Sequence, residues 1–174
     1  DQKYAGTKIT TFEELLKYAS EEAKVEFLHV ELKTTLSYQQ KEYLVNLVNK
    51  YNLQEKVGWQ SFIWSEFLDF NILAPKMQLE VLSSRYTDEM LYTLNELNNG
   101  QRNVVASLSS NLTSVQMAVS SGYEVYVWTI DSEDVLENFK GLNVTAYMTN
   151  GTREIERVIK EESFAQIKKK KKKL

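Results

Sequence analysis

Two oppositely charged residues, spaced two apart, are the part of this sequence best suited to chemistry. Glu31 and Lys33 end an apolar-rich run, Phe27–Lys33. Side chains alternate between the faces of a strand, so both charges and His29 share one face near the strand's C-terminal end. Sites in parallel α/β sheets and barrels are built at that end. Glu31 and Lys33 are therefore candidate site residues, and the alternatives are a solvated strand end and a structural ion pair between them.

The numbers of cysteine and histidine residues limit the kinds of catalytic and metal site that this chain can contain. The sequence has no Cys and one His, which excludes disulfides, thiol catalysis and multi-histidine metal sites within it. A Ser-His-Asp triad would need His29, but no G-x-S-x-G motif accompanies it. We interpret His29 as structural. Any metal would be held by oxygen atoms, which favours Mg²⁺ or Ca²⁺.

The basic charge is concentrated near the C-terminal end. The net charge is −3, and without the six lysines Lys168–Lys173 the rest of the chain carries −9. An acidic body is a poor surface for nucleic acid, whose affinity comes largely from phosphate neutralisation. We predict no nucleic-acid partner, a domain over residues 1–163 and a disordered lysine-rich tail over residues 164–174. Contact of Lys168–Lys173 with an anionic membrane surface is the alternative.

Hydrophobic periodicity predicts one helix followed by six strand–helix units. The first helix begins at Thr10 or Thr11, either of which can cap it ahead of acidic residues. The predicted strands cover residues 27–33, 57–62, 77–82, 104–108, 124–129 and 144–150. The helices predicted to follow them cover residues 38–52, 65–73, 87–97, 113–121, 132–139 and 153–161.

Strict alternation of strands and helices argues for a parallel sheet covered by helices. Six units without a long insertion favour a barrel over a doubly wound sheet. A complete eight-stranded barrel takes about 250 residues, whereas this chain has 174. The sequence therefore predicts an α/β fold, an incomplete (β/α)8 TIM barrel whose six consecutive units correspond to strands 3–8, with the missing units upstream. The strands at 27–33 and 144–150 would be open edges that invite self-association.

Several motifs in the expected order resemble those of the glycerophosphodiester phosphodiesterase family, over about residues 4–159. The matching segments are Ile9–Leu16 (family pattern I-P-T-L-E-E-V-L), Val30–Lys33 (E-[IL]-K), Gln60–Phe62 (S-S-F), Gly122–Thr129 (G-x-x-V-x-V-W-T) and Met148–Asn150 (T-[ND]). Two departures stand out, because Thr10 replaces the usual proline and Gly151-Thr152 replace the usual x-P.

The resemblance implies a phosphoric diester hydrolase: the parent protein would hydrolyse glycerophosphodiesters to sn-glycerol 3-phosphate and an alcohol in a metal-dependent reaction. It implies Glu31 as one of three carboxylate metal ligands, Lys33 as a phosphate contact, and Phe62 and Trp128 as walls of the glycerol pocket. The family's H-R-G, E-x-D and H-D segments, which carry the catalytic histidines, should lie upstream of Asp1. No catalytic residue is expected within this chain, which should be inactive alone.

The expected cofactor is Mg²⁺ or Ca²⁺, bound weakly by this piece alone. The alternative function is that of a non-catalytic, degenerate barrel that binds a phosphodiester or a protein partner. No run of 18 apolar residues is present, so no transmembrane helix is expected in this piece. The lack of cysteine does not fix the compartment; we favour a membrane-associated or extracellular position in a longer bacterial protein.

Overall fold

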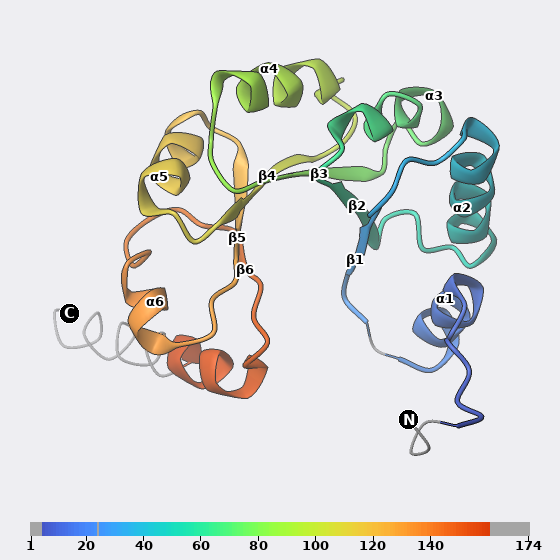
Figure 1. The fold of residues 1–174 in the computed structure, drawn as a ribbon, viewed down its shortest axis with the longest axis horizontal. Coiled ribbons are helices and arrows are strands. Elements are labelled where there is room, and N and C mark those ends of the chain that lie inside the picture. Colours follow the sequence, from blue (N-terminus) through green and yellow to red (C-terminus); the bar gives the residue numbers. More distant parts are fainter. Residues whose placement is uncertain (1–4, 24, 161–174) are drawn as a thin grey trace, which may run out of the picture. The chain divides into compact units, whose positions relative to one another are not determined.

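A six-stranded sheet in the order β1-β2-β3-β4-β5-β6 is the framework of the fold (Figure 1). The computed structural model describes residues 5–23 and 25–160. Strand β1 pairs with β2, β4 with β5, and β5 with β6, each in parallel. The strands are β1 (Leu28–Glu31), β2 (Val57–Ser61), β3 (Gln78–Ser83), β4 (Val104–Ser109), β5 (Glu124–Trp128) and β6 (Ala146–Tyr147).

Helices connect these strands in the predicted alternation. They are α1 (Phe12–Glu21), α2 (Tyr38–Lys50), the 3₁₀ helix η2 (Trp64–Phe67), α3 (Phe70–Leu73), α4 (Asp88–Leu97), α5 (Leu112–Ser120) and α6 (Glu133–Glu137). Residues 152–160 are also helical. A doubly wound sheet reverses its strand order, whereas this sheet follows the sequence. The prediction of an incomplete (β/α)8 barrel with six units is confirmed.

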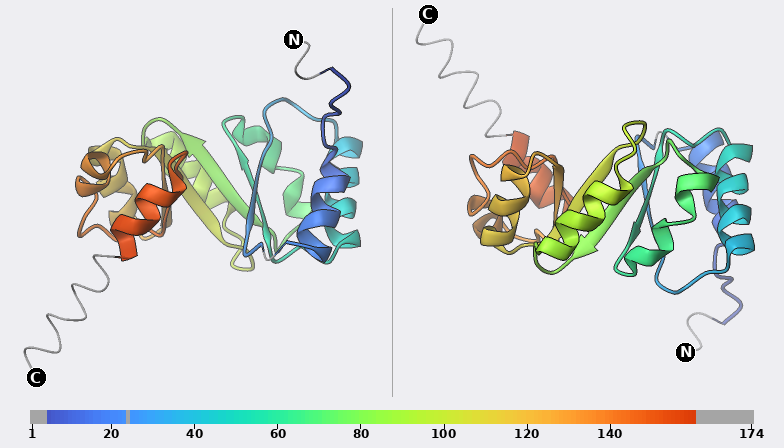
Figure 2. Two further views of the ribbon diagram at one scale, coloured as in Figure 1. Left: turned by 90° about the horizontal axis from the view of Figure 1, so that it is seen from below. Right: turned by 90° about the horizontal axis from the view of Figure 1, so that it is seen from above.

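The chain divides into two compact units, one of residues 1–79 and 97–103 and the other of residues 80–96 and 104–174. In the first unit, α1 and α2 lie side by side (Figure 2), and Lys50 Nζ of α2 lies 2.6 Å from Glu13 Oε1 of α1. Within the described part of the chain, every helix is too short or too polar to cross a bilayer. The predicted tail, 164–174, lies outside the described residues.

Capping residues set where the first two helices begin. The Glu14 N–H donates to Thr11 Oγ1 over 3.2 Å, and the Thr11 N–H donates to Glu14 Oε2 over 2.8 Å. Ser37 and Gln40 form the same reciprocal pair at the start of α2. Each capping box satisfies two backbone donors that have no partner within the helix. The predicted helix start at Thr11 is confirmed.

An aromatic cluster forms the core of the first unit. The Trp59 side chain in β2 is fully buried, with its ring centroid 5.2 Å from that of Phe70 and 6.0 Å from that of Phe12. Its indole N–H donates to Met77 Sδ over 3.2 Å. Aromatic side chains of this size contribute large apolar areas to a core, so a single strand residue links α1, α3 and the start of β3.

Aliphatic residues form the core of the second unit. Val125 and Val127 of β5 pair in register with Ala106 and Leu108 of β4, and all four are fully buried. Helix α5 packs against both strands (Figure 1). Because side chains alternate along a strand, Trp128 projects from the face of β5 opposite to these valines.

The helix predicted over residues 65–73 is divided into η2 and α3. A 3₁₀ helix has three residues per turn, so residues three apart project from the same side. Glu66 of η2 and Asp69, which precedes α3, both lie within ion-pair distance of Lys41. The ring centroids of Phe67 and Phe70 lie 6.5 Å apart. Both pairs therefore join η2 to the start of α3.

The last strand is much shorter than the predicted range, 144–150. Only Ala146 and Tyr147 are assigned to β6, although the Thr145 N–H donates to the Val125 carbonyl and the Met148 N–H to the Val127 carbonyl. The contact with β5 is therefore longer than the strand. Beyond it, residues 149–151 turn to hydrogen-bond with Asp131 and with one another.

Candidate functional site

Glu31 and Lys33 lie together at the C-terminal end of β1. Lys33 Nζ donates to Glu31 Oε2 over 2.5 Å. The Lys33 side chain is 77% exposed and that of Glu31 is 24% exposed, so a ligand can reach both groups. The structure shows the ion pair that was the alternative to a metal role, and an ammonium with three donors keeps two for another acceptor.

Phe62 lies at the matching position on the neighbouring strand. Glu31 pairs in register with Gln60, and Lys33 and Phe62 each lie two residues beyond that pair. Phe62 is 53% exposed, so a ligand can reach its ring. The first unit therefore brings Glu31, Lys33 and Phe62 to one edge of the sheet.

Trp128 is the last residue of β5 in the second unit. It is half-buried and pairs in register with Ser109, whose hydroxyl donates to the Ser84 carbonyl over 2.7 Å. Like Glu31, it stands at the C-terminal end of its strand. The strand-end placement of the predicted residues is observed, and the roles assigned to Glu31, Lys33, Phe62 and Trp128 stay predictions.

His29 lies in β1, two residues before Glu31. Its side chain is exposed, and its ring centroid is 5.1 Å from that of Phe27. This contact with a neighbouring aromatic ring is in keeping with the structural interpretation of His29.

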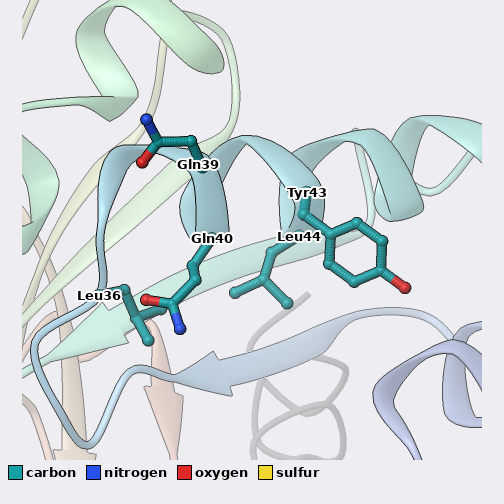
Figure 3. Close-up of a pocket in the computed structure, with 5 residues that line it drawn as sticks. All are labelled: Leu36, Gln39, Gln40, Tyr43 and Leu44. Carbon is teal, nitrogen blue, oxygen red and sulfur yellow. The ribbon is translucent and has the colours of Figure 1, made fainter.

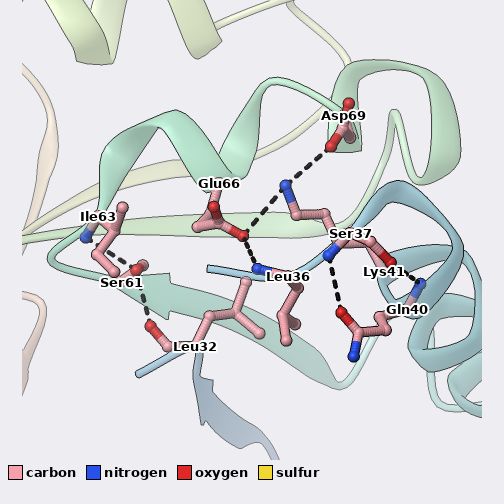
Figure 4. A network of polar contacts seen from close by, with 9 residues as sticks. All are labelled: Leu32, Leu36, Ser37, Gln40, Lys41, Ser61, Ile63, Glu66 and Asp69. Carbon is pink, nitrogen blue, oxygen red and sulfur yellow. Dashed lines mark hydrogen bonds and ion pairs between the residues drawn. The ribbon is translucent and has the colours of Figure 1, made fainter. Parts of the chain in front are cut away.

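A buried network behind the β1–α2 loop was not predicted from the sequence (Figure 4). Lys41 Nζ lies 2.8 Å from Asp69 Oδ2 and 3.1 Å from Glu66 Oε2. The side chains of Lys41 and Glu66 are only 4% and 3% exposed. Burial lowers the pKa of Lys41, but hydrogen bonds to Asp69 and Glu66 outweigh it, so the pKa is raised. The only sequence signal was the pair of acids spaced three apart among apolar residues at 64–70.

A hollow of about 340 Å³ lies on the surface beside α2 (Figure 3). Its lining residues are Leu36, Gln39, Gln40, Tyr43 and Leu44. None of the four predicted site residues contributes to it. We therefore assign it no role in the predicted substrate site.

A second unpredicted cluster joins the segments that follow β5 and β6. The Asn150 N–H donates to Asp131 Oδ1 over 2.7 Å, its side-chain amide donates to Asp131 Oδ2 over 3.0 Å, and the Thr149 hydroxyl donates to Asp131 Oδ1 over 3.2 Å. These bonds, first that from the Asn150 side chain, hold the pKa of Asp131 below its usual range. Thr149 and Asn150 of the last motif thus have a clear structural role.

The hydrogen bonds to Asp131 are expected to weaken at acidic pH. A depressed pKa means that Asp131 contributes stability above its unfolded pKa, near 3.8, and that this contribution is lost as the pH falls through the lower folded value. We expect the Asn150 amide resonance in NMR to titrate with a midpoint below 3.8 and the Asp131→Asn variant to lack this titration. A midpoint at or above the ordinary value would contradict the assignment.

The described residues do not make up a metal site. Among residues 5–23 and 25–160, no group of three or more Asp, Glu, His or Cys side chains is placed to hold a metal ion. Ca²⁺ takes six to eight oxygen ligands, and Mg²⁺ takes six, of which one or two are usually protein carboxylates and the others water or substrate phosphate. Glu31 can supply one ligand, so the donor set present here does not by itself fit either ion.

The sheet order and the polar strand ends define a protein of the (β/α)-barrel class, whose sites lie at the C-terminal ends of the strands. A family model described as "Glycerophosphoryl diester phosphodiesterase family" matches residues 1–154. The chain belongs to this family, as the motifs indicated. A comparison with curated protein sequences finds no match.

Solved structures with the same fold come from related enzymes. A glycerophosphodiester phosphodiesterase from Parabacteroides distasonis has 20% identity and a TM-score of 0.68, with 88% of this chain and 65% of that chain covered. A Galdieria sulphuraria protein assigned to the same activity has 22% identity and a TM-score of 0.76, with 90% and 66% covered. An Oleispira antarctica phosphodiesterase in complex with the product sn-glycerol-3-phosphate has 15% identity and a TM-score of 0.66, with 91% and 64% covered. The chain thus spans about two thirds of these proteins.

Proposed function

We propose that the protein to which this chain belongs hydrolyses glycerophosphodiesters to sn-glycerol 3-phosphate and an alcohol. The family match over residues 1–154 is the observation that carries the proposal. The exposed Glu31–Lys33 pair at a strand end supports it, because that is where barrel enzymes place their polar groups. The chain spans about two thirds of the related structures, so the activity is proposed for the whole protein.

Lys33 would bind the phosphate of the substrate. Its ammonium already donates to Glu31 and can donate to a phosphate oxygen at the same time. A cation beside the phosphoryl group would offset the charge that develops in the transition state. Phe62 and Trp128 would pack against the glycerol carbons as walls of the pocket, and general acid–base catalysis would come from groups outside this chain.

We also propose Mg²⁺ or Ca²⁺ as the cofactor of the whole protein, with Glu31 as one of its ligands. Because one carboxylate cannot hold a hard cation tightly, calorimetry should find only weak, roughly millimolar binding by this chain. The Glu31→Ala variant should differ little from wild type. Micromolar binding would contradict this expectation and would point to other carboxylates.

The proposal is tested on the parent protein. Glycerophosphocholine hydrolysis should fall by about 100-fold or more in Lys33→Met, as expected when transition-state charge stabilisation is lost. Lys50→Met removes an exposed lysine of the first unit that pairs with Glu13, so it serves as the matched control and should keep full activity. Activity equal to wild type in Lys33→Met would contradict the assigned role.

The alternative is a non-catalytic barrel that binds a phosphodiester or a protein partner. The residues encoded before Asp1 in the parent gene discriminate between the two functions. Segments of the H-R-G, E-x-D and H-D types favour the enzyme, whereas a start codon at Asp1 would favour the binding module. A membrane contact through Lys168–Lys173, on an extracellular or membrane-associated parent, also remains a proposal.

Self-association of this chain is expected from its sheet edges. Strands β1 and β6 are the two ends of the strand order, and an outermost strand presents backbone groups to which another strand can bind. Light scattering at tens of micromolar should therefore give a mass above that of the 20.2 kDa monomer, falling on dilution. A stable monomer that unfolds cooperatively at these concentrations would contradict the expectation.

A further inference from the structure

The carboxylate of Glu66 is aimed at the backbone of the β1–α2 loop (Figure 4). The Leu36 N–H donates to Glu66 Oε2 over 2.9 Å. The same oxygen lies 3.1 Å from Lys41 Nζ, and both charged side chains are buried. A buried carboxylate held by a lysine and a backbone donor has little freedom to move. It therefore fixes one end of the loop.

A serine holds the other end of the same loop. The Ser61 hydroxyl donates to the Leu32 carbonyl over 2.9 Å and accepts a hydrogen bond from the Ile63 N–H over 3.0 Å. The Leu32 N–H continues the β1–β2 ladder by donating to the Gln60 carbonyl over 2.8 Å. Residues 33–35, which include Lys33, thus span the short distance between two fixed points.

We propose that Glu66 is a positioning residue, which holds residues 33–35 in place so that Lys33 meets the substrate phosphate. This inference rests on the proposed function, because it takes Lys33 as the phosphate contact. The Lys33 ammonium is held by an ion pair with Glu31, but its side chain is 77% exposed and so has little packing of its own. The fixed backbone of residues 33–35 therefore determines where the Lys33 side chain begins. A misplaced binding group weakens binding and catalysis strongly.

Electrostatics alone predicts that removing Glu66 would strengthen phosphate binding, whereas a positioning role predicts that binding would weaken. Glu66 is negatively charged, so its loss should favour binding of an anion nearby. Loss of the fixed loop should instead weaken binding. The sign of the change in affinity therefore distinguishes a positioning role from an electrostatic one.

The test uses the 174-residue chain and sn-glycerol 3-phosphate, with the amides of residues 33–36 followed by NMR. In Glu66→Leu we expect the dissociation constant to rise about tenfold, as for the loss of one hydrogen bond to a charged group, and the Leu36 amide to exchange faster. Glu66→Gln, which keeps an acceptor for Leu36, should restore binding to within about threefold of wild type. Asp69→Asn is the matched control, because it alters the same lysine without touching Leu36, and it should leave binding unchanged.

Glu66→Asp keeps a negative charge in the buried network, which the flexible Lys41 side chain can follow, but its carboxylate is one methylene farther from the fixed Leu36 N–H. It should therefore weaken binding even if Glu66→Leu fails to fold. The proposal would be overturned if Glu66→Leu and Glu66→Asp both bound sn-glycerol 3-phosphate as tightly as wild type or more tightly. If the wild-type chain shows no binding, phosphate binding requires parts of the protein outside this chain, and the role of Lys33 in the proposed function is decided by the activity of Lys33→Met in the parent protein. The positioning role is then decided by amide exchange at residues 33–36, and unchanged exchange in Glu66→Asp would overturn it.

Discussion

Replacing Lys41 with methionine is expected to lower the free energy of unfolding by about 3 to 5 kcal/mol, the typical cost of removing one partner of a buried ion pair. Glu66 would keep a charge at 3% exposure, with only the Leu36 N–H as an observed donor. Chemical denaturation measured by circular dichroism gives this quantity. Methionine has a similar length, so the effect reports lost charge pairing more than lost volume.

Two controls accompany the Lys41 variant. The double variant Lys41→Met/Glu66→Leu removes both buried charges and should regain much of the stability. Lys50→Met breaks an exposed pair with Glu13, for which a cost of about 1 kcal/mol or less is expected. Equal stability losses in Lys41→Met and Lys50→Met would show that the buried network contributes no more than a surface pair.

The pH dependence of the Lys41 effect follows from the direction of its pKa shift. The pKa is raised above its ordinary value of 10.5, so the contribution to stability is fully present below that value. It is lost as the pH rises through the higher folded pKa. The difference in free energy of unfolding between wild type and Lys41→Met should therefore stay constant from pH 7 to pH 10. It should decrease only above pH 10.

The second prediction with a large effect concerns the enzymatic activity of this chain alone. The purified chain should release no sn-glycerol 3-phosphate from glycerophosphocholine, with either Mg²⁺ or Ca²⁺ present. General acid–base catalysis contributes about 10²- to 10⁴-fold to rate, and the resemblance places those groups outside this sequence. Turnover that depends on a metal and disappears in Glu31→Ala would contradict this expectation and show that this chain suffices for activity. The full parent protein is the positive control.

The regular elements could be predicted because local sequence determines them. Valine and tyrosine alternate through Glu124–Trp128, and the capping box of Thr11 and Glu14 marks a helix start by itself. The order of six such units was enough to predict a barrel-type sheet. The strand-end placement of Glu31 and Trp128 followed from the same pattern.

The polar networks could not be predicted, because their partners lie far apart in the sequence. Lys41 meets Glu66 only after two loops and a strand have folded, and periodicity holds no information on such contacts. The division of residues 65–73 into η2 and α3 also has no signal in the periodicity, which is why a continuous helix was predicted there. Likewise, the bonds from Thr149 and Asn150 to Asp131 explain why β6 ends early.

The buried position of Trp59 gives the molecule a built-in fluorescent reporter. An indole shielded from water by Phe12 and Phe70 emits at shorter wavelength than one in solvent. Met77, whose sulfur accepts the indole hydrogen bond, is a polarisable neighbour that can quench the emission. Trp64 also belongs to the first unit, so the combined red shift of Trp59 and Trp64 on denaturation will follow unfolding of that unit. The Trp128→Phe variant removes the second unit's tryptophan, so comparing the two spectra tells whether both units unfold in one transition.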